Sequence, residues 1–99
     1  QEFGTAMQYN ANIIVIISNN GVYGTIRMHQ EQTYPGRISG TDMLNPNFAL
    51  LAKSYGGFGE TVTKTEEFLP TFERARSSGK PAIIELKTDP LALSPQTAA

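Results

Sequence analysis

The sequence predicts an α/β domain, part of a doubly wound parallel sheet whose elements follow the order α-β-α-α-β-α-β. Three observations support this prediction. Five apolar residues in a row, Ile13–Ile17, predict a strand that is buried on both faces, as strands of parallel sheets usually are. Two later segments also have the composition of strands. Helical segments separate the three strands, which is the arrangement that right-handed crossovers between parallel strands require.

The first half of the chain predicts two helices around this strand. A helix covers residues 1–9, and a second helix covers residues 23–32. Tyr34-Pro35-Gly36 ends the second helix, because proline cannot continue a helix. Residues 37–44 are expected to form an irregular loop.

A third helix is expected directly after this loop. Asn45-Pro46 is typical of a helix start, with Asn45 as the N-cap and proline in the first turn. Gly56-Gly57 ends the helix. Four apolar residues at i, i+3, i+4 and i+7 form the stripe that we expect to be buried: Phe48, Leu51, Ala52 and Tyr55.

The last part of the chain predicts a strand, a helix and a strand. The strand at residues 58–62 leads into Thr63-Lys64-Thr65-Glu66, which has the pattern of a capping box. The helix that follows ends at Gly79, and residues 82–86 form the third strand. Five residues of that helix are expected on its buried face: Phe68, Leu69, Phe72, Ala75 and Arg76. We expect the domain to cover residues 1–88 and a frayed tail to cover residues 89–99.

Composition limits the possible partners. The 99 residues allow one small domain, and a formal net charge of −1 gives no basic patch for nucleic acid. The absence of cysteine excludes disulfides and thiol chemistry. The longest apolar run is too short to cross a membrane. We therefore expect a cytoplasmic protein that binds neither nucleic acid nor a membrane. Because about three strands are few for an open sheet, we also expect a fragment of a longer chain.

The motif Asn19-Asn20-Gly21-Val22-Tyr23-Gly24 follows the first strand at once. Open α/β sheets bind ligands at this carboxyl edge. The start of the next helix offers backbone N–H groups and a partial positive charge, which suit a phosphate. Asn-Gly pairs are also common in tight turns, so these residues alone leave a simple turn as the alternative.

Together with its flanking strand and helix, this motif resembles the second half of the thiamine diphosphate motif, which ends in Asn-Asn. The resemblance extends from Gln1-Glu2-Phe3 to Gly79-Lys80-Pro81-Ala82. The chain looks like the C-terminal cofactor domain of the acetolactate synthase and benzoylformate decarboxylase group. This resemblance implies a thiamine-diphosphate-binding fold, with thiamine diphosphate and Mg²⁺ as cofactors.

The resemblance also implies the metal ligands. The side chain of Asn20 and the carbonyl of Val22 correspond to two Mg²⁺ ligands, and neutral oxygens suit this ion. A third ligand, the Asp of a Gly-Asp-Gly turn, would lie shortly before Gln1. Asn19 is expected to hold the turn through hydrogen bonds to the backbone.

Three further residues are implied as cofactor contacts. Gly21 and Gly24 would let the main chain approach the phosphates closely. Tyr23 and Gly24 would offer backbone N–H groups at the start of the helix. The glutamate that activates the cofactor ring belongs to another domain in this group. We therefore assign no catalytic residue to this chain, and we interpret Glu2 as a residue of the helix surface.

Thr25, Ile26 and His29 are the substrate-pocket candidates that the resemblance implies. Simple pyruvate decarboxylases have Thr-Ile-Glu where this chain has Thr25-Ile26-Arg27, which counts against release of an aldehyde. Acetohydroxyacid synthases have Gln-Trp-Gln where this chain has Met28-His29-Gln30, so the substrate stays open. His29 could transfer a proton, although a single helical histidine is more commonly a surface or supporting residue. Arg37, in the later loop, could meet a substrate carboxylate or a coenzyme A phosphate, although a loop arginine is more commonly solvated.

The function implied is part of an enzyme that decarboxylates 2-oxo acids with carboligation, an acetolactate synthase-like transferase. The alternatives are a benzoylformate- or oxalyl-CoA-decarboxylase-like lyase, and a non-catalytic fragment with an incomplete cofactor site. The expected partners are a small 2-oxo acid and the remainder of the parent chain, which would form a homodimer or homotetramer. Alone, the 99 residues are expected to be inactive.

Overall fold

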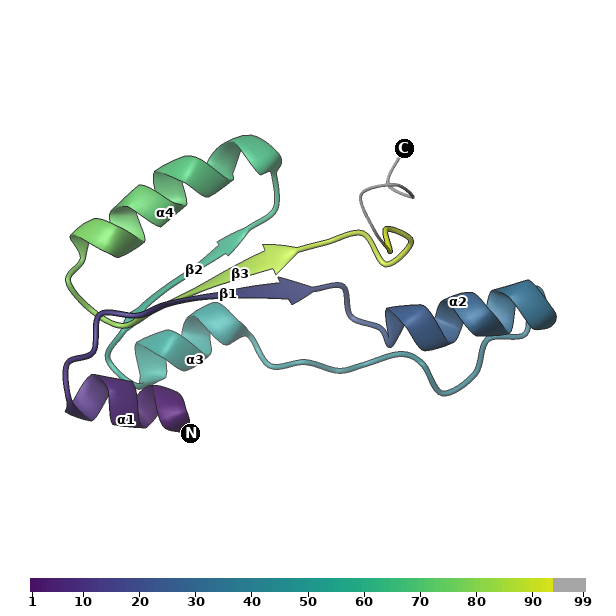
Figure 1. The fold of residues 1–99 in the computed structure, drawn as a ribbon, viewed down its shortest axis with the longest axis horizontal. Coiled ribbons are helices and arrows are strands. Elements are labelled where there is room, and N and C mark those ends of the chain that lie inside the picture. Colours follow the sequence, from purple (N-terminus) through teal and green to yellow (C-terminus); the bar gives the residue numbers. More distant parts are fainter. Residues whose placement is uncertain (94–99) are drawn as a thin grey trace. The chain divides into compact units, whose positions relative to one another are not determined.

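The computed structural model describes residues 1–93, and its elements follow the expected order, with one added 3₁₀ turn (Figure 1). The elements are α1 (Glu2–Gln8), β1 (Ile14–Asn19), α2 (Gly24–Thr33), α3 (Phe48–Ser54), β2 (Phe58–Val62), the 3₁₀ turn η1 (Thr65–Glu67), α4 (Phe68–Ser77) and β3 (Ala82–Lys87). The later part of the expected tail, residues 94–99, lies outside the described residues. None of the described helices is long and apolar enough to cross a membrane.

The chain divides into two compact units, which are described separately. The first unit comprises residues 1–19 and 46–87 and contains the whole sheet. The second unit comprises residues 20–45 together with the chain from residue 88 onward. The boundary at residue 20 falls inside the Asn-Asn motif.

The sheet has three parallel strands in the order β1-β3-β2, so the last strand in the sequence is central. Ala82 of β3 lies opposite Ile14 of β1 and Phe58 of β2. Helices α3 and α4 both contact β2 and β3 (Figure 1). The prediction that β1 is buried on both faces is wrong: Ile16 is 46% exposed, because the two helices lie over β2 and β3 and not over this edge strand.

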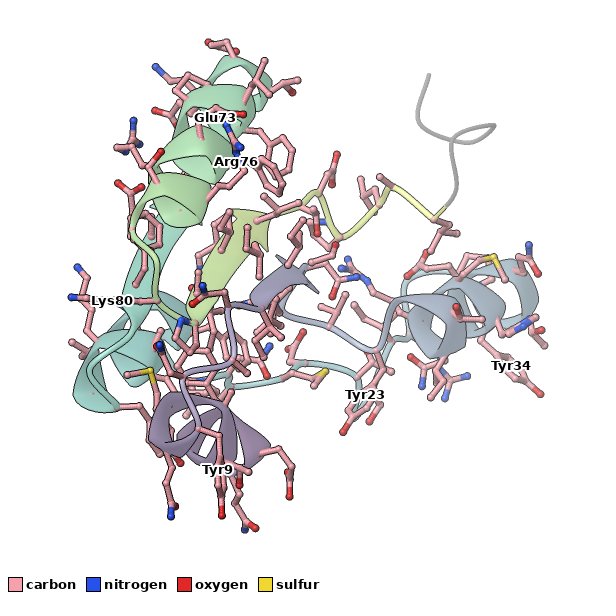
Figure 2. All side chains as sticks on the ribbon, turned by 60° about the vertical axis from the view of Figure 1, so that its left-hand side comes forward. Tyr9, Tyr23, Tyr34, Glu73, Arg76 and Lys80 are labelled. Atoms are coloured by element: carbon pink, nitrogen blue, oxygen red, sulfur yellow. The ribbon has the colours of Figure 1, made fainter. Side chains whose placement is uncertain are left out.

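Helix α4 covers one face of the sheet with a narrower stripe than expected. Ala75 belongs to the buried core, and Phe68 and Phe72 are partly buried and pack against it, so these three face the sheet as predicted. Leu69 is 65% exposed, and Arg76 forms an exposed ion pair with Glu73 at 2.8 Å (Figure 2). Only a narrow stripe of this helix contacts the small sheet. Residues that neighbour the stripe therefore face solvent. The core cluster consists of Val62, Ala75, Ala82 and Ile84, with partly buried neighbours around it.

Helix α3 starts two residues later than expected. Its N-cap is Asn47, whose side-chain oxygen accepts a hydrogen bond from the Leu50 N–H at 2.9 Å, so the assignment to Asn45 is wrong. Small residues are buried here, Ala49 and Ala52, whereas Leu51 of the expected stripe is exposed.

This helix lies very close to β2. A Cβ atom added to Gly59 would lie 2.8 Å from the carbonyl carbon of Ala49, and closer still to its oxygen. The approach of α3 to the sheet therefore requires glycine at position 59. Tyr55, just after α3, packs edge-on against Phe3 with ring centroids 5.8 Å apart.

The turn between β2 and α4 is capped by a different acid from the one expected. The Glu67 carboxylate accepts hydrogen bonds from the N–H groups of Thr63 and Lys64 and from the Thr63 hydroxyl. The bond from the Thr63 N–H makes the largest contribution to lowering the pKa of Glu67. The 3₁₀ turn shifts the cap by one residue from Glu66, which the sequence pattern indicated.

Candidate functional site

The Asn-Asn motif occupies the junction between β1 and α2. Asn19 is the last residue of β1, and α2 begins at Gly24. Gly21 between them has a φ of 72°, a conformation that favours glycine. The sequence prediction of a strand, a tight turn and a helix at this place is confirmed.

The side chain of Asn20 is folded back on its own turn. Its Oδ1 accepts a hydrogen bond from the Val22 N–H at 3.1 Å, which fixes the orientation of the amide. An amide oxygen has a second lone pair, so this bond leaves it able to coordinate a cation. A Cβ atom at Gly24 would lie 3.1 Å from the Asn20 Nδ2, so glycine at the start of α2 leaves room for this amide.

The loop before α3 is paired with the motif and is less irregular than expected. Val22 and Asp42 form an antiparallel bridge. It is flanked by hydrogen bonds from the Tyr23 N–H to the Thr41 carbonyl and from the Met43 N–H to the Gly21 carbonyl, both 2.8 Å. The expectation that the Tyr23 N–H is open to a phosphate is therefore wrong, because Thr41 accepts it. For the N–H of Gly24, no acceptor is found among residues 1–93, so this donor remains available.

The oxygen atoms of this turn suit a magnesium ion as part of a ligand set. Within the described chain, no hydrogen bond to the Val22 carbonyl is found, and the Asn20 amide has a lone pair to spare. Both are hard, neutral oxygens, which Mg²⁺ accepts beside phosphate oxygens. No group of three or more His, Cys, Asp or Glu residues that could hold a metal occurs in residues 1–93. A magnesium ion here therefore needs further ligands from phosphates or from another segment.

Asn19, unlike Asn20, is anchored to the sheet. It is buried, and its Nδ2 donates a hydrogen bond of 2.7 Å to the Glu85 carboxylate, a partner that the sequence analysis missed. Sequence patterns could have indicated Glu85 only as an acid inside the apolar strand Ala82-Ile83-Ile84-Glu85-Leu86.

The Glu85 carboxylate is held in its charged form. Burial alone would raise its pKa, but the hydrogen bond from Asn19, the ammonium group of Lys87 at 3.0 Å and the Phe48 N–H together lower the pKa below its usual range. The group therefore stays ionised at neutral pH, and its charge contributes to stability.

Acid should remove that contribution. A carboxylate whose pKa is lowered by folding stabilises the protein at pH values above its unfolded pKa of about 4.3. This stabilisation is lost as the pH falls through the lower pKa of the folded state. At pH 7 we expect Glu85→Gln to lower the free energy of unfolding by roughly 1.5–3 kcal/mol, the usual range for hydrogen bonds to a charged group. Urea unfolding of both proteins at pH 7 and pH 3 should show the difference shrinking in acid. An equal difference at both pH values would contradict this account, and the exposed carboxylate of Glu66, changed to Gln, is the control.

The substrate-pocket candidates lie on α2, none of whose residues is buried. Thr25 and His29 are exposed, and Ile26 is 55% exposed. The Nε of Arg27 is buried, and no partner for it is found in the described part of the chain. In the described part of the chain these three candidates therefore lie at the surface.

Two other predicted residues lie at the surface. The Arg37 guanidinium lies over the ring of Tyr34, 6.0 Å from its centroid, in an exposed loop (Tyr34 is labelled in Figure 2). Glu2 is exposed in the first turn of α1, in agreement with its interpretation as a surface residue.

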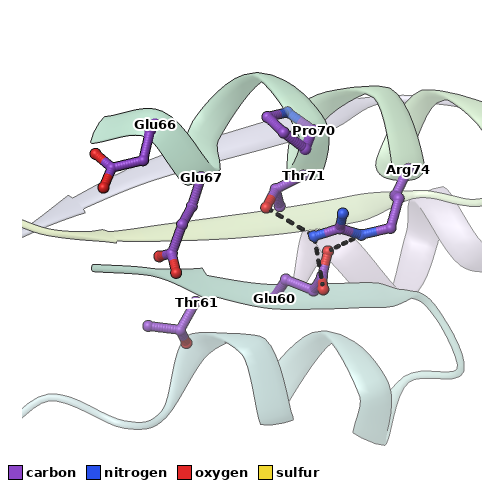
Figure 3. Close-up of a pocket in the computed structure, with 7 residues that line it drawn as sticks. All are labelled: Glu60, Thr61, Glu66, Glu67, Pro70, Thr71 and Arg74. Carbon is purple, nitrogen blue, oxygen red and sulfur yellow. Dashed lines mark hydrogen bonds and ion pairs between the residues drawn. The ribbon is translucent and has the colours of Figure 1, made fainter. Parts of the chain in front are cut away.

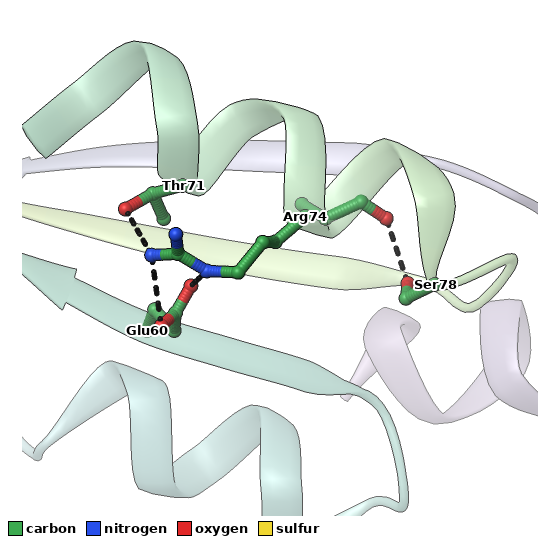
Figure 4. A network of polar contacts seen from close by, with 5 residues as sticks. Glu60, Thr71, Arg74 and Ser78 are labelled. Atoms are coloured by element: carbon green, nitrogen blue, oxygen red, sulfur yellow. Dashed lines mark hydrogen bonds and ion pairs between the residues drawn. The ribbon is translucent and has the colours of Figure 1, made fainter.

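A hollow of about 350 Å³ lies between β2 and α4 (Figure 3). It is lined by charged and polar residues: Glu60, Thr61, Glu66, Glu67, Pro70, Thr71 and Arg74. The Arg74 guanidinium already pairs with Glu60 at 3.1 Å and donates to Thr71 at 3.0 Å (Figure 4). Arg74, Glu60 and Thr71 thus satisfy one another's hydrogen bonds. This side of the hollow is a surface ion-pair cluster.

The chain is similar to known proteins over most of its length. Residues 1–86 match the sequence profile of the family described as "Thiamine pyrophosphate enzyme, C-terminal TPP binding domain". The chain is 38% identical over 88 residues to the acetolactate synthase large subunit of Parasynechococcus marenigrum. This match covers 87% of this chain and 14% of that protein. It is 30% identical over 95 residues to the acetolactate synthase large subunit of Mycobacterium tuberculosis, covering 96% of this chain and 17% of that protein.

A solved structure shows the same fold. The thiamine diphosphate-dependent 4-hydroxybenzoylformate decarboxylase of Rhodococcus jostii superposes with a TM-score of 0.74 and 33% sequence identity. The match covers 88% of this chain and 16% of that one. The chain thus spans only 14% to 17% of the length of these relatives.

Proposed function

Because the chain belongs to the family of thiamine pyrophosphate enzymes, as a C-terminal cofactor-binding domain, we propose that it anchors the diphosphate of thiamine diphosphate through Mg²⁺. The observation that carries this proposal is the turn at residues 20–22, just before the start of α2. It has an oriented amide oxygen and a carbonyl, that of Val22, to which no donor is found among residues 1–93. Such a turn offers oxygens to a cation and, at Gly24, an N–H group to a phosphate.

In this proposal the enzyme acts on 2-oxo acids, with decarboxylation followed by carboligation as in an acetolactate synthase. When bound, thiamine diphosphate supplies the electron sink that lets a 2-oxo acid lose CO₂. Asn20 and Val22 would hold the metal, and the Gly24 N–H would bind a phosphate oxygen. Thr25, Ile26 and His29 would line the substrate side when other segments of the enzyme complete the pocket. No residue of this chain supplies the acid that activates the cofactor ring.

The proposed domain comprises residues 1–88, followed by a tail, and the domain would be the C-terminal part of a longer enzyme. The proposed assembly is a cytoplasmic homodimer or homotetramer. An intact mass near the 10.8 kDa of this chain would identify the sample as a fragment without a complete cofactor site. That result would favour the non-catalytic alternative.

A decarboxylase that releases its product without carboligation is the second candidate. Its support is the 33% identity to the Rhodococcus jostii 4-hydroxybenzoylformate decarboxylase. Arg27, where simple pyruvate decarboxylases have glutamate, speaks against a decarboxylase of that simple kind.

Product analysis separates the two candidates. The full-length protein, loaded with Mg²⁺ and thiamine diphosphate, is incubated with pyruvate and separately with benzoylformate. We expect acetolactate from pyruvate. Release of benzaldehyde from benzoylformate, without turnover of pyruvate, would establish the second candidate instead. Failure to bind the cofactor at all would overturn both candidates.

A further inference from the structure

Glu85 carries the most buried charged group among the described residues. It lies on the central strand β3 and is 1% exposed. A buried carboxylate is costly unless donors surround it. The structure supplies such donors, and their origin indicates what the carboxylate does.

The donors come from all three strands of the sheet and from the start of α3. Oε2 accepts from Asn19 of β1 at 2.7 Å and pairs with Lys87 of β3 at 3.0 Å. Oε1 accepts from the Phe48 N–H, at the start of α3, at 3.3 Å and from the Thr61 hydroxyl of β2 at 3.4 Å. A carboxylate is an acceptor-only group with about four lone-pair sites, so four donors match its capacity.

One of these four bonds reaches the proposed metal-binding motif. Asn19 is the last residue of β1, and the next peptide bond leads to Asn20. The bond of Asn19 to Glu85 is the shortest of the four. It joins two side chains on neighbouring strands, so it fixes the point at which the chain leaves the sheet for the turn.

We infer that Glu85 is a positioning residue for the cofactor: by holding the amide of Asn19, it sets where the Asn20 turn begins. This inference rests on the proposed function, because it assigns a purpose to the turn that follows Asn19. Groups that orient metal ligands from behind typically change metal affinity by about 10- to 100-fold when they are removed.

An isosteric exchange tests the inference in the full-length protein, stripped of cofactor and titrated calorimetrically with thiamine diphosphate at fixed Mg²⁺. Glu85→Gln replaces the charged acceptor with an amide whose NH₂ group must face a donor, either the Asn19 Nδ2 or the Phe48 N–H, and we expect the Kd to rise about tenfold or more. Asn19→Asp places two carboxylates together and should cause a similar rise. The double variant Asn19→Asp/Glu85→Gln restores one amide and one carboxylate in the same shape, and should return the Kd to within about threefold of the wild type. Additive losses in the double variant would overturn the inference.

Two further variants separate positioning from loss of structure. Glu60→Gln removes a carboxylate from β2 on the sheet face that α4 covers, where its partner is Arg74, and should leave the Kd unchanged. Asn19→Ala leaves the three other donors of Glu85 in place and should still weaken cofactor binding by about tenfold. If Glu85→Gln fails to fold, an unchanged Kd for Asn19→Ala is the result that overturns the inference. Melting curves of each protein without cofactor show whether the Kd changes track stability.

The same titration of Asn20→Ala distinguishes failure of the proposed function from failure of the positioning role. If Asn20→Ala binds the cofactor normally, the proposed function fails. If Asn20→Ala weakens binding while Glu85→Gln and Asn19→Ala do not, only the positioning role fails.

Discussion

Replacing Asn20 with alanine is expected to raise the Kd for thiamine diphosphate by about 100-fold in the presence of Mg²⁺. Removal of an outer-shell group costs 10- to 100-fold in metal affinity, and loss of a direct oxygen ligand should reach the upper end of this range. A 100-fold change corresponds to roughly 2.8 kcal/mol of binding free energy. The substitution also removes the acceptor of the Val22 N–H, so the carbonyl of the same residue loses its fixed orientation. Calorimetric titration of the full-length protein measures the effect.

Two variants calibrate this result. Asn20→Asp keeps an oxygen atom in the same place, so its affinity should fall between those of the wild type and the alanine variant. Asn12→Ala removes an exposed asparagine from the loop before β1 and should bind the cofactor normally. Equal Kd values for Asn20→Ala and Asn12→Ala would show that the side chain of Asn20 is not a ligand.

Replacing Gly59 with alanine is expected to be the most destabilising single methyl addition in the first unit. The new Cβ atom would lie within contact distance of three backbone atoms of Ala49, with 2.8 Å to the carbonyl carbon and 3.0 Å to Cα. Backbone cannot rotate away as a side chain can, so α3 must move off the sheet. Overpacking of this kind costs about 3 kcal/mol, at the upper end of the usual range. The loss should appear in the free energy of unfolding measured by urea denaturation.

Gly79→Ala is the matched comparison. Its Cβ atom would meet no atom within 4 Å, but its φ of 67° is unfavourable for alanine. We expect a cost of about 1 kcal/mol from the backbone conformation alone. If Gly59→Ala lowers the free energy of unfolding by no more than Gly79→Ala does, α3 does not approach β2 as closely as described.

The elements of this domain were predictable because their signals are local. The apolar run before Asn19 predicted β1, and glycines marked the ends of the third and last helices. The motif was predictable for the same reason, since its strand, turn and helix follow one another along the chain. These are features that neighbouring residues determine.

The errors concern features that distant residues determine. Asn45 and Asn47 are equally suitable N-caps by type, and the packing of α3 against the sheet selects Asn47. The exposure of Ile16 and Leu69 depends on where the helices lie over the strands, which no local pattern specifies. The donor Asn19 lies 66 residues away from Glu85 in the sequence, so no local pattern identifies this pair.

The strand order has a consequence for synthesis on the ribosome. Because β3 lies between β1 and β2 in space but after both in the sequence, neither of those strands has its partner until Ala82–Lys87 has been made. The nascent chain therefore carries β1 and β2 with unpaired edges, the state in which parallel sheets are slow to fold and prone to aggregate. The pairing of β1 and β2 with β3 can therefore form only after residue 87 has left the exit tunnel.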